Sequence, residues 1–414
     1  MKNYKILILA VLIIFSVSSC GKKSWKTKLN PEDIELSGKD KQLVNADNKF
    51  GFDLFKSVAE SEDAGENIML SPTSVALALA MTYNGAEAET KIVMEETLNL
   101  QGLSIEEINK SYQYLIDALV TVDNKVTLNI ANSIWYRNTF SVVQDFINTN
   151  QDYYNAEVKA LDFNSPTAKE TINNWVADKT NDKITEIIDN ISADAVMYLI
   201  NAIYFKGIWH YEFDESDTEE QGFTLSDGTS EQVETMTLKA DLNYSYNDLF
   251  KAVELPYGQG NYTMMLFVPK GENTVNDIVS ELNIENWNNW LSDFEQTSSV
   301  NVFLPKFTFE YEKKMNELLS DLGMEIAFNA YLADFSKINP NVQLYISEVK
   351  HKTFIEVNEE GTEAAAVTSV EIGITSTGEG ESGVFIRFDK PFLFAIREVT
   401  TNAVIFLGKV ENPE

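Results

Sequence analysis

Residues 359–374 decide the fold, and they read Glu-Glu-Gly-Thr-Glu-Ala-Ala-Ala-Val-Thr-Ser-Val-Glu-Ile-Gly-Ile. They alternate with a period of two, as residues do in a strand that has one buried face. One row is small at first and then apolar, and we call it the inward row: Thr362, Ala364, Ala366, Thr368, Val370 and Ile372. The run 375–383 that follows is built mainly of Gly, Ser, Thr and Glu, which predicts a loop. A strand pattern therefore stands in a loop context.

The amino terminus predicts export and a lipid anchor. Lys2 and Lys5 precede an apolar run at 6–17 that is too short for an ordinary transmembrane span. Residues 17–20, Val-Ser-Ser-Cys, resemble a bacterial lipobox, in which the cysteine becomes the lipidated first residue of the mature protein. We therefore expect a signal peptide at 1–19 and attachment through Cys20 to a bacterial envelope membrane, at the outer membrane or cell surface, with extracellular release as the alternative. Because Cys20 is the only cysteine, the folded part can contain no disulfide.

The bulk composition describes one large acidic domain behind a tether. Residues 20–42 are polar and predict a flexible tether, whose lysines either touch anionic headgroups or are simply solvated. The remainder, 43–414, can build a large core, since 44% of the chain is hydrophobic. A net charge of −32 argues against a nucleic-acid partner, which needs a basic face. We expect a monomer.

Hydrophobic periodicity and turn residues place helices mainly in the first half of the chain and strands mainly in the second. Helices are expected at 45–59, 72–83, 87–98, 105–120, 140–154, 167–180 and 315–322. Strands are expected at 67–70, 126–136, 157–161, 195–205, 251–257, 262–269, 299–310, 343–358, 384–388, 392–398 and 403–410. Without regular strand–helix alternation, this order predicts an α+β architecture with large antiparallel or mixed sheets.

The sequence offers no recognisable catalytic or metal site. His210 and His351 are the only histidines, and neither belongs to a zinc-binding or nucleophile motif. The single cysteine is assigned to lipidation, so no catalytic thiol remains. Among 64 acidic residues, no carboxylate pair stands out as a glycosidase site. We expect neither an enzyme nor a bound cofactor or metal.

Four motifs in order resemble those of the serpin family over residues 43–414. Residues 359–366 (Glu-Glu-Gly-Thr-Glu-Ala-Ala-Ala) are similar to the hinge of inhibitory members. Residues 201–209 (Asn-Ala-Ile-Tyr-Phe-Lys-Gly-Ile-Trp) resemble the central-strand motif, and 71–79 resemble the buried helix. Residues 388–394 with 406–410 resemble the carboxy-terminal signature. The hinge residues are Glu359, Glu360, Gly361, Thr362, Glu363, Ala364, Ala365 and Ala366.

The resemblance implies a fold and a mechanism. The fold would be a large central mixed sheet with two further sheets, helices around them and an exposed reactive loop at about 359–387. The mechanism would be suicide inhibition, in which a protease cleaves the loop, forms an acyl-enzyme and is trapped when residues 361–375 enter the central sheet as a strand. The inward row has no proline and no charge, either of which would oppose insertion. The alternative is a non-inhibitory serpin that acts as a binding or chaperone-like surface protein.

The same resemblance assigns supporting residues. Ser71, Ser74, Asn201 and His351 match a polar cluster beneath the centre of the sheet, where strands part to admit the loop. Glu359 matches an acidic residue at the top of that opening, Lys306 matches its salt-bridge partner, and Trp209 would pack nearby. We refer to these positions, apart from Glu359, which belongs to the hinge, as the sheet-opening cluster.

The loop sequence narrows the target proteases. Family spacing puts the reactive bond at Thr375–Ser376, with Ile374, Glu379 and Glu381 as alternative positions. No Arg or Lys occurs between Gly361 and Arg387, which argues against trypsin-like targets. The small and aliphatic residues favour elastase-like, subtilisin-like or papain-like proteases. A glutamate-specific protease is the further alternative.

Overall fold

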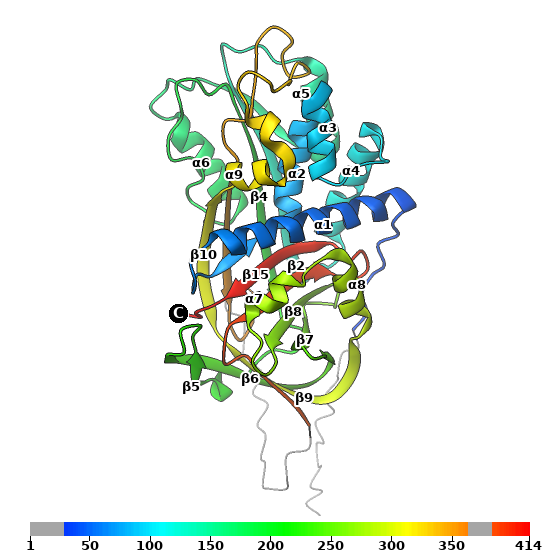
Figure 1. Ribbon diagram of the computed structural model, residues 1–414, viewed down its shortest axis with the longest axis vertical. Helices are drawn as coiled ribbons and strands as arrows, with labels where there is room; N and C mark the ends of the chain where they lie inside the picture. The colour runs from blue at the N-terminus through cyan, green and yellow to red at the C-terminus, as the bar shows by residue number, and fades with distance from the viewer. Residues whose placement is uncertain (1–28, 363–382) are drawn as a thin grey trace, which may run out of the picture.

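The computed structural model describes residues 29–362 and 383–414, which form an elongated body built from two β-sheets and helices (Figure 1). Helices α3, α5, α6 and α9 gather toward one end, and strands β5, β6 and β9 lie toward the other (Figure 1). The helices are α1 (Gly38–Ser61), α2 (Pro72–Tyr83), α3 (Ala88–Thr97), α4 (Ile105–Thr121), α5 (Gln144–Tyr154), α6 (Ala168–Lys179), α7 (Val275–Ser280), α8 (Ile284–Ser292) and α9 (Asn316–Leu319).

The six-stranded sheet is the mixed sheet that contains the hinge. Its order is β10 (Phe307–Lys314), β11 (Lys350–Val357), β12 (Gly361–Thr362), β4 (Met197–Ile208), β2 (Val126–Arg137) and β3 (Glu157–Leu161). The β2–β3 pair is parallel and the other neighbours are antiparallel. Helix α2 is buried on nearly every side and packs against both β4 and β15, so it joins this sheet to the second one. Ser71 caps α2 by accepting a hydrogen bond from the Ser74 amide.

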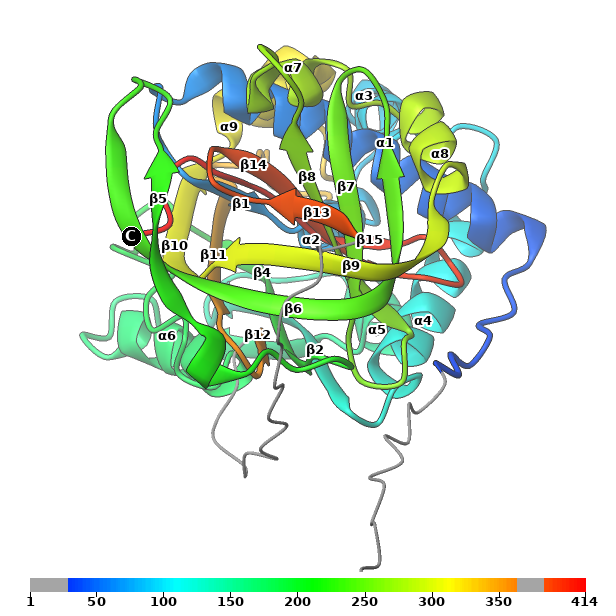
Figure 2. The same ribbon diagram turned by 90° about the horizontal axis from the view of Figure 1, so that it is seen from below.

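The second sheet is continuous and has nine strands. Its order is β1 (Ile68–Leu70), β15 (Val404–Val410), β14 (Phe392–Glu398), β8 (Tyr262–Pro269), β7 (Phe250–Pro256), β6 (Ser230–Tyr246), β9 (Glu295–Pro305) and β13 (Val384–Arg387), with β5 (Glu219–Thr224) also paired to β6. The two further sheets expected beside the central one are thus joined. The cause is β6, whose 17 residues pair in turn with β5, β9 and β7 as the strand curves beneath the molecule (Figure 2).

Most expected elements are present, and several boundaries differ. The strand expected at 299–310 is broken at Lys306, so that β9 and β10 belong to different sheets, and Pro305, which has no amide hydrogen to donate, is the last residue of β9. Of the extended stretch 343–358, only β11 is a strand. The helix expected at 315–322 is regular only over α9, and a wider turn carries the chain to Gly323, whose φ of 116° suits glycine.

The tether is shorter than the sequence suggested. Residues 38–42 belong to α1, which begins at Gly38 behind a capping box made by Ser37 and Asp40. Residues 29–37 also form hydrogen bonds to the body. The boundary that we expected at 42 is therefore too late in the chain, and the part of the tether that precedes Leu29 lies outside the described residues.

Candidate functional site

The hinge enters the six-stranded sheet at Gly361. Gly361 pairs with Ile208 of β4, and Thr362 pairs with Gly207 of β4 on one side and Val357 of β11 on the other. Among the described residues, β4 and β11 have no pairing with each other, so these two strands are joined only through Gly361 and Thr362. The loop context predicted from sequence thus starts with two residues that are already strand.

Glycine is required where the hinge enters the sheet. A Cβ on Gly361 would lie 2.1 Å from the carbonyl oxygen of Gly207, and one on Gly207 would lie 2.8 Å from the ring of Tyr257. Both contacts are closer than a Cβ atom tolerates, so Gly361 allows the hinge backbone to approach β4, and Gly207 leaves room for the Tyr257 ring.

Thr362 points inward, toward the core. Its side chain is 3% exposed, and its hydroxyl lies 2.5 Å from that of Tyr257. The Tyr257 ring is fully buried and stacks on Trp209, with 4.4 Å between ring centroids and 14° between planes. Burial raises the pKa of the Tyr257 phenol, so the hydroxyl stays protonated and available for this hydrogen bond.

The turn at residues 358–360, which includes the first two hinge residues, is held by Trp209 and by the Asn358 side chain. The Trp209 indole donates to the Asn358 carbonyl at 2.9 Å, and its amide donates to the Glu360 carbonyl at 2.8 Å. The Asn358 side chain accepts from the amides of Glu360 and Gly361. The tight reversal at 358–360 therefore has partners for its backbone groups on both sides.

Glu359 is a buried carboxylate with two partners. Its side chain is 9% exposed, accepts a hydrogen bond from the Thr218 hydroxyl at 2.8 Å and lies 3.4 Å from the Lys306 ammonium. Lys306 also pairs with Glu234 at 3.4 Å. Partial burial alone would lower the pKa of Lys306, but the charges of Glu359 and Glu234 outweigh burial and raise that pKa. The structure thus brings together the two residues that the resemblance paired.

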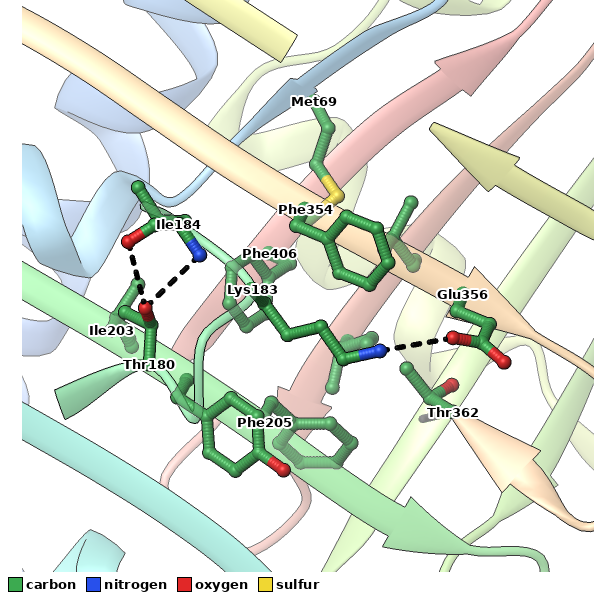
Figure 3. A pocket seen from close by; sticks show the side chains of 13 residues that line it. Met69, Thr180, Lys183, Ile184, Ile203, Phe205, Phe354, Glu356, Thr362 and Phe406 are labelled. Carbon is green, nitrogen blue, oxygen red and sulfur yellow. Dashed lines mark hydrogen bonds and ion pairs between the residues drawn. The ribbon is translucent and has the colours of Figure 1, made fainter. Parts of the chain in front are cut away.

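A narrow cavity continues the line of β12 between β4 and β11 (Figure 3). Its volume is about 20 Å³, enough for one water, and its walls include residues 203–205 of β4 and 354–356 of β11. Lys183 crosses this gap, with its ammonium 3.2 Å from Glu356 and 4.7 Å from the centre of the Phe354 ring. The gap is therefore lined mainly by apolar and aromatic side chains and bridged by one ion pair.

A polar cluster lies farther along the same two strands. The Ser71 amide donates to Nε2 of His351 at 3.0 Å, and the Ser74 hydroxyl donates to Asn201. The Asn201 side chain in turn donates to Asn132 at 2.7 Å. Burial lowers the pKa of His351 to about 4, so the imidazole is neutral and accepts through Nε2.

The predicted sheet-opening cluster is thus two separate groups. Ser71, Ser74, Asn201 and His351 come together where α2 meets β4 and β11, while Lys306 and Trp209 surround the hinge turn. Sequence reasoning missed Tyr257, Thr218 and Asn132, which complete these groups. Tyr257 carried only one signal, its place just before the glycines of a predicted hairpin turn.

Several predicted site residues lie outside the described residues. They are Cys20, Glu363, Ala364, Ala365, Ala366, Ile374, Thr375, Ser376, Glu379 and Glu381. Within 29–362 and 383–414, no His, Cys, Asp and Glu side chains gather as a metal site would require. No helix in this part of the chain is both long and apolar enough to cross a bilayer.

Fold and site together define an α+β protein whose central sheet is parted by the first residues of a loop. Residues 45–413 match the family model described as Serpin (serine protease inhibitor). The chain belongs to the serpin family, whose members generally act as inhibitors rather than as catalysts.

Relatives and solved structures agree with this assignment. An uncharacterized serpin-like protein of Methanosarcina acetivorans is 35% identical over 90% of this chain and 86% of its own length. The leukocyte elastase inhibitor of Xenopus laevis is 33% identical over 90% of this chain and 99% of its own. The native-state crystal structure of tengpin, a thermophilic serpin, has a TM-score of 0.81 at 38% identity and covers 93% of this chain and 97% of its own.

Proposed function

We propose that this serpin is a suicide inhibitor of serine proteases, with cysteine proteases as further targets. One observation carries the proposal: Gly361 and Thr362 are already paired between β4 and β11, and within the part of the chain that the structure describes these two strands have no pairing with each other. Strand edges with free amide and carbonyl groups are a template for an added strand. A cleaved loop would complete both ladders at once, which drives insertion.

The register of the hinge indicates where each following residue would go. Continuing the pairs of Thr362 along both strands sets Ala364 between Phe205 and Ile355, and Ala366 between Ile203 and Thr353. The next inward residue, Thr368, would lie between Asn201 and His351. The only polar residue of the inward row beyond the hinge thereby meets the polar cluster, while its alanines meet crowded apolar and aromatic side chains.

The proposed targets follow from the loop sequence. Cleavage at Thr375–Ser376, or at Ile374, Glu379 or Glu381, suits elastase-like, subtilisin-like, papain-like or glutamate-specific proteases. An elastase inhibitor among the relatives supports the first of these.

The test is to mix the protein with each of these proteases and with trypsin. We expect a covalent complex that survives SDS with at least one of the former and none with trypsin, and mass spectrometry of the cleaved protein to locate the bond. Clean loop cleavage without a complex across the whole panel would support the non-inhibitory alternative instead.

We further propose that the chain is exported and lipidated at Cys20 in a bacterial envelope. The support is the signal-like amino terminus and the Val-Ser-Ser-Cys sequence. Mass spectrometry of the mature amino terminus should find acyl chains on Cys20, and Cys20→Ser should release the protein from the membrane fraction.

A further inference from the structure

Residues 29–37 are fastened to the body along most of their length. The Asn30 amide donates to the Gln259 carbonyl at 3.1 Å, and the Asn261 side chain bonds both the amide and the carbonyl of Glu32, at 2.9 and 2.7 Å. The Ile34 amide donates to the Thr400 hydroxyl at 3.1 Å. Asn261 is fully buried, so its two bonds to Glu32 are shielded from water. This segment is therefore part of the folded domain, and it fixes the place where the chain before Leu29 joins the body.

The turn that holds this segment also holds the hinge. Residues 257–261 join β7 to β8, and Leu29 covers Gly260 so closely that a Cβ there would lie 2.8 Å from Leu29 Cδ2. At the start of the same turn, the Tyr257 hydroxyl meets Thr362, and the Gly258 amide donates to the Ile208 carbonyl at 2.9 Å. Leu29 and Thr362 are thus attached to one turn, at what we call the loop pole.

The opposite end of the molecule, which we call the far pole, is separated from the loop pole by the length of the strands in the six-stranded sheet. Strand β2 begins at Val126, which pairs with Gly207 beside the hinge, and runs 12 residues to Arg137. At about 3.3 Å per residue this strand spans roughly 36 Å. The segment beyond α9, drawn yellow to orange at the top of Figure 1, lies at the far pole, where its Asp334 amide donates to the Thr90 hydroxyl of α3 at 2.8 Å. Tyr331 in this segment is 91% exposed.

We propose that the loop pole faces the membrane, so that the serpin meets proteases that work at the lipid surface. The inference rests on the proposed inhibitory function and on lipidation of Cys20. Eight residues lie between Cys20 and Leu29, and the nine steps along the chain, at about 3.5 Å each, reach roughly 30 Å at most. The exit point of the tether therefore stays within that distance of the lipid, and the hinge is attached to the same turn.

The short distance favours proteases that are bound to the same surface. A protease of about 230 residues has a radius of gyration near 17 Å, hence a diameter of about 45 Å. On the lipid, a protease of this size occupies the same layer as the hinge and meets the loop at a high effective concentration, whereas a protease in bulk water must first diffuse into that layer. Insertion along β4 and β11 would then carry the captured protease toward the far pole, away from the lipid.

The orientation can be measured directly on the full lipidated chain. A donor dye is attached to Lys125→Cys, an exposed position at the loop pole, or to Tyr331→Cys at the far pole. Each protein is inserted into vesicles of phosphatidylethanolamine and phosphatidylglycerol (3:1) that carry a rhodamine lipid acceptor. We expect energy transfer to be at least twofold stronger from position 125. Thirty Gly/Ser residues inserted after Lys28 should bring the two positions close to equality.

Equal or stronger transfer from position 331 in the unextended protein, or an unacylated Cys20, would overturn the proposal. A second measurement compares inhibition of one protease either free in solution or anchored to the same vesicles by a lipid-bound tag. Anchoring should raise the inhibition rate at least tenfold, and the tether extension should remove most of that gain; equal rates would contradict the proposal. Failure to form complexes even in detergent would reject the inhibitory function but leave the measured orientation standing.

Discussion

The hydroxyls of Tyr257 and Thr362 lie 2.5 Å apart, and they connect the first inward residue of the hinge to the turn between β7 and β8. Both side chains are buried, so each hydroxyl depends on the other for its hydrogen bond. This contact secures the only strand pairing that connects β4 to β11 in the described residues.

Tyr257→Phe should loosen that link without altering the stacking on Trp209. We expect the free energy of unfolding to fall by about 1 kcal/mol, the usual net value of one hydrogen bond. Hydrogen exchange of the Thr362 amide should accelerate. Tyr246→Phe is the matched control, because Tyr246 is 68% exposed, and it should change neither quantity. Unaltered exchange in Tyr257→Phe would show that the hydroxyl contact does not hold the hinge.

The neutral, buried His351 should make stability depend on pH. Its pKa is about 4 in the folded protein and 6.5 in the unfolded chain. Between these values only the unfolded chain binds the proton, so the contribution is fully present above pH 6.5 and is lost as the pH falls toward 4. The full effect is about 3 kcal/mol. Denaturant unfolding of the wild type and His351→Gln from pH 4 to 7.5 should give a stability difference that rises up to pH 6.5 and then levels.

Asp47 provides the opposite control for the same measurement. Burial raises the pKa of Asp47 to about 7, although the hydrogen bond from the Tyr112 hydroxyl lowers that pKa in part. Just below pH 7 the folded protein therefore binds a proton at Asp47 that the unfolded chain has already lost. This group stabilises the fold at low pH and loses that contribution as the pH rises toward 7. The difference between the wild type and Asp47→Asn should therefore slope the other way. Identical slopes for the two variants would contradict both assignments.

Lys306 and Glu359 should be energetically coupled. Because Glu359 is nearly buried and also bonds Thr218, a double-mutant cycle of Lys306→Met and Glu359→Gln should give about 0.5–1.5 kcal/mol. The exposed Lys110–Glu106 pair at 2.6 Å is the control and should show no measurable coupling, because water screens it. If the buried pair behaves like the exposed one, Glu359 is held by Thr218 and the turn rather than by the ion pair.

Local elements could be predicted from the sequence because their signals are local. Ser71 and Pro72 mark the start of α2, and period-two alternation marks β11 and the first hinge residues. The curvature of β6 and its three partners could not be predicted, because pairing in a sheet is set by contacts between distant residues. The nine-stranded sheet follows from those pairings.

In the candidate site, too, contacts between residues far apart in the sequence could not be predicted from local patterns. Ser71 and His351 stand 280 residues apart, and no periodicity connects them, so only the family resemblance placed them together. Tyr257 stayed unnoticed because its role depends on Gly207 leaving room for its ring. That relationship exists only after two sheets have packed.

Thr368→Val should lower the stability of the cleaved protein and leave that of the uncleaved protein unchanged. The register places Thr368 between Asn201 and His351 after insertion, where a valine would leave polar partners unsatisfied. We expect the cleaved form to lose about 1–2 kcal/mol of stability. The uncleaved form should unfold as the wild type does, because we propose that residue 368 joins the sheet only after cleavage. Ser369→Ala, in the opposite row, is the control; equal effects of both variants on the cleaved form would refute the register.

Thr362→Arg should convert the inhibitor into a substrate. The Thr362 side chain is 3% exposed between β4 and β11, and an arginine there would bury an unpaired charge at a cost of several kcal/mol. The hinge would be forced out of the sheet, so insertion would be too slow to trap the acyl-enzyme before it hydrolyses. The measurement is the number of inhibitor molecules consumed per protease inactivated, which should rise at least tenfold while loop cleavage continues. Glu360→Arg introduces the same side chain at a half-buried neighbour and should inhibit normally, and circular dichroism establishes that both variants are folded. A Thr362→Arg protein that inhibits with wild-type stoichiometry would disprove the role of Gly361 and Thr362 as the start of the inserting strand.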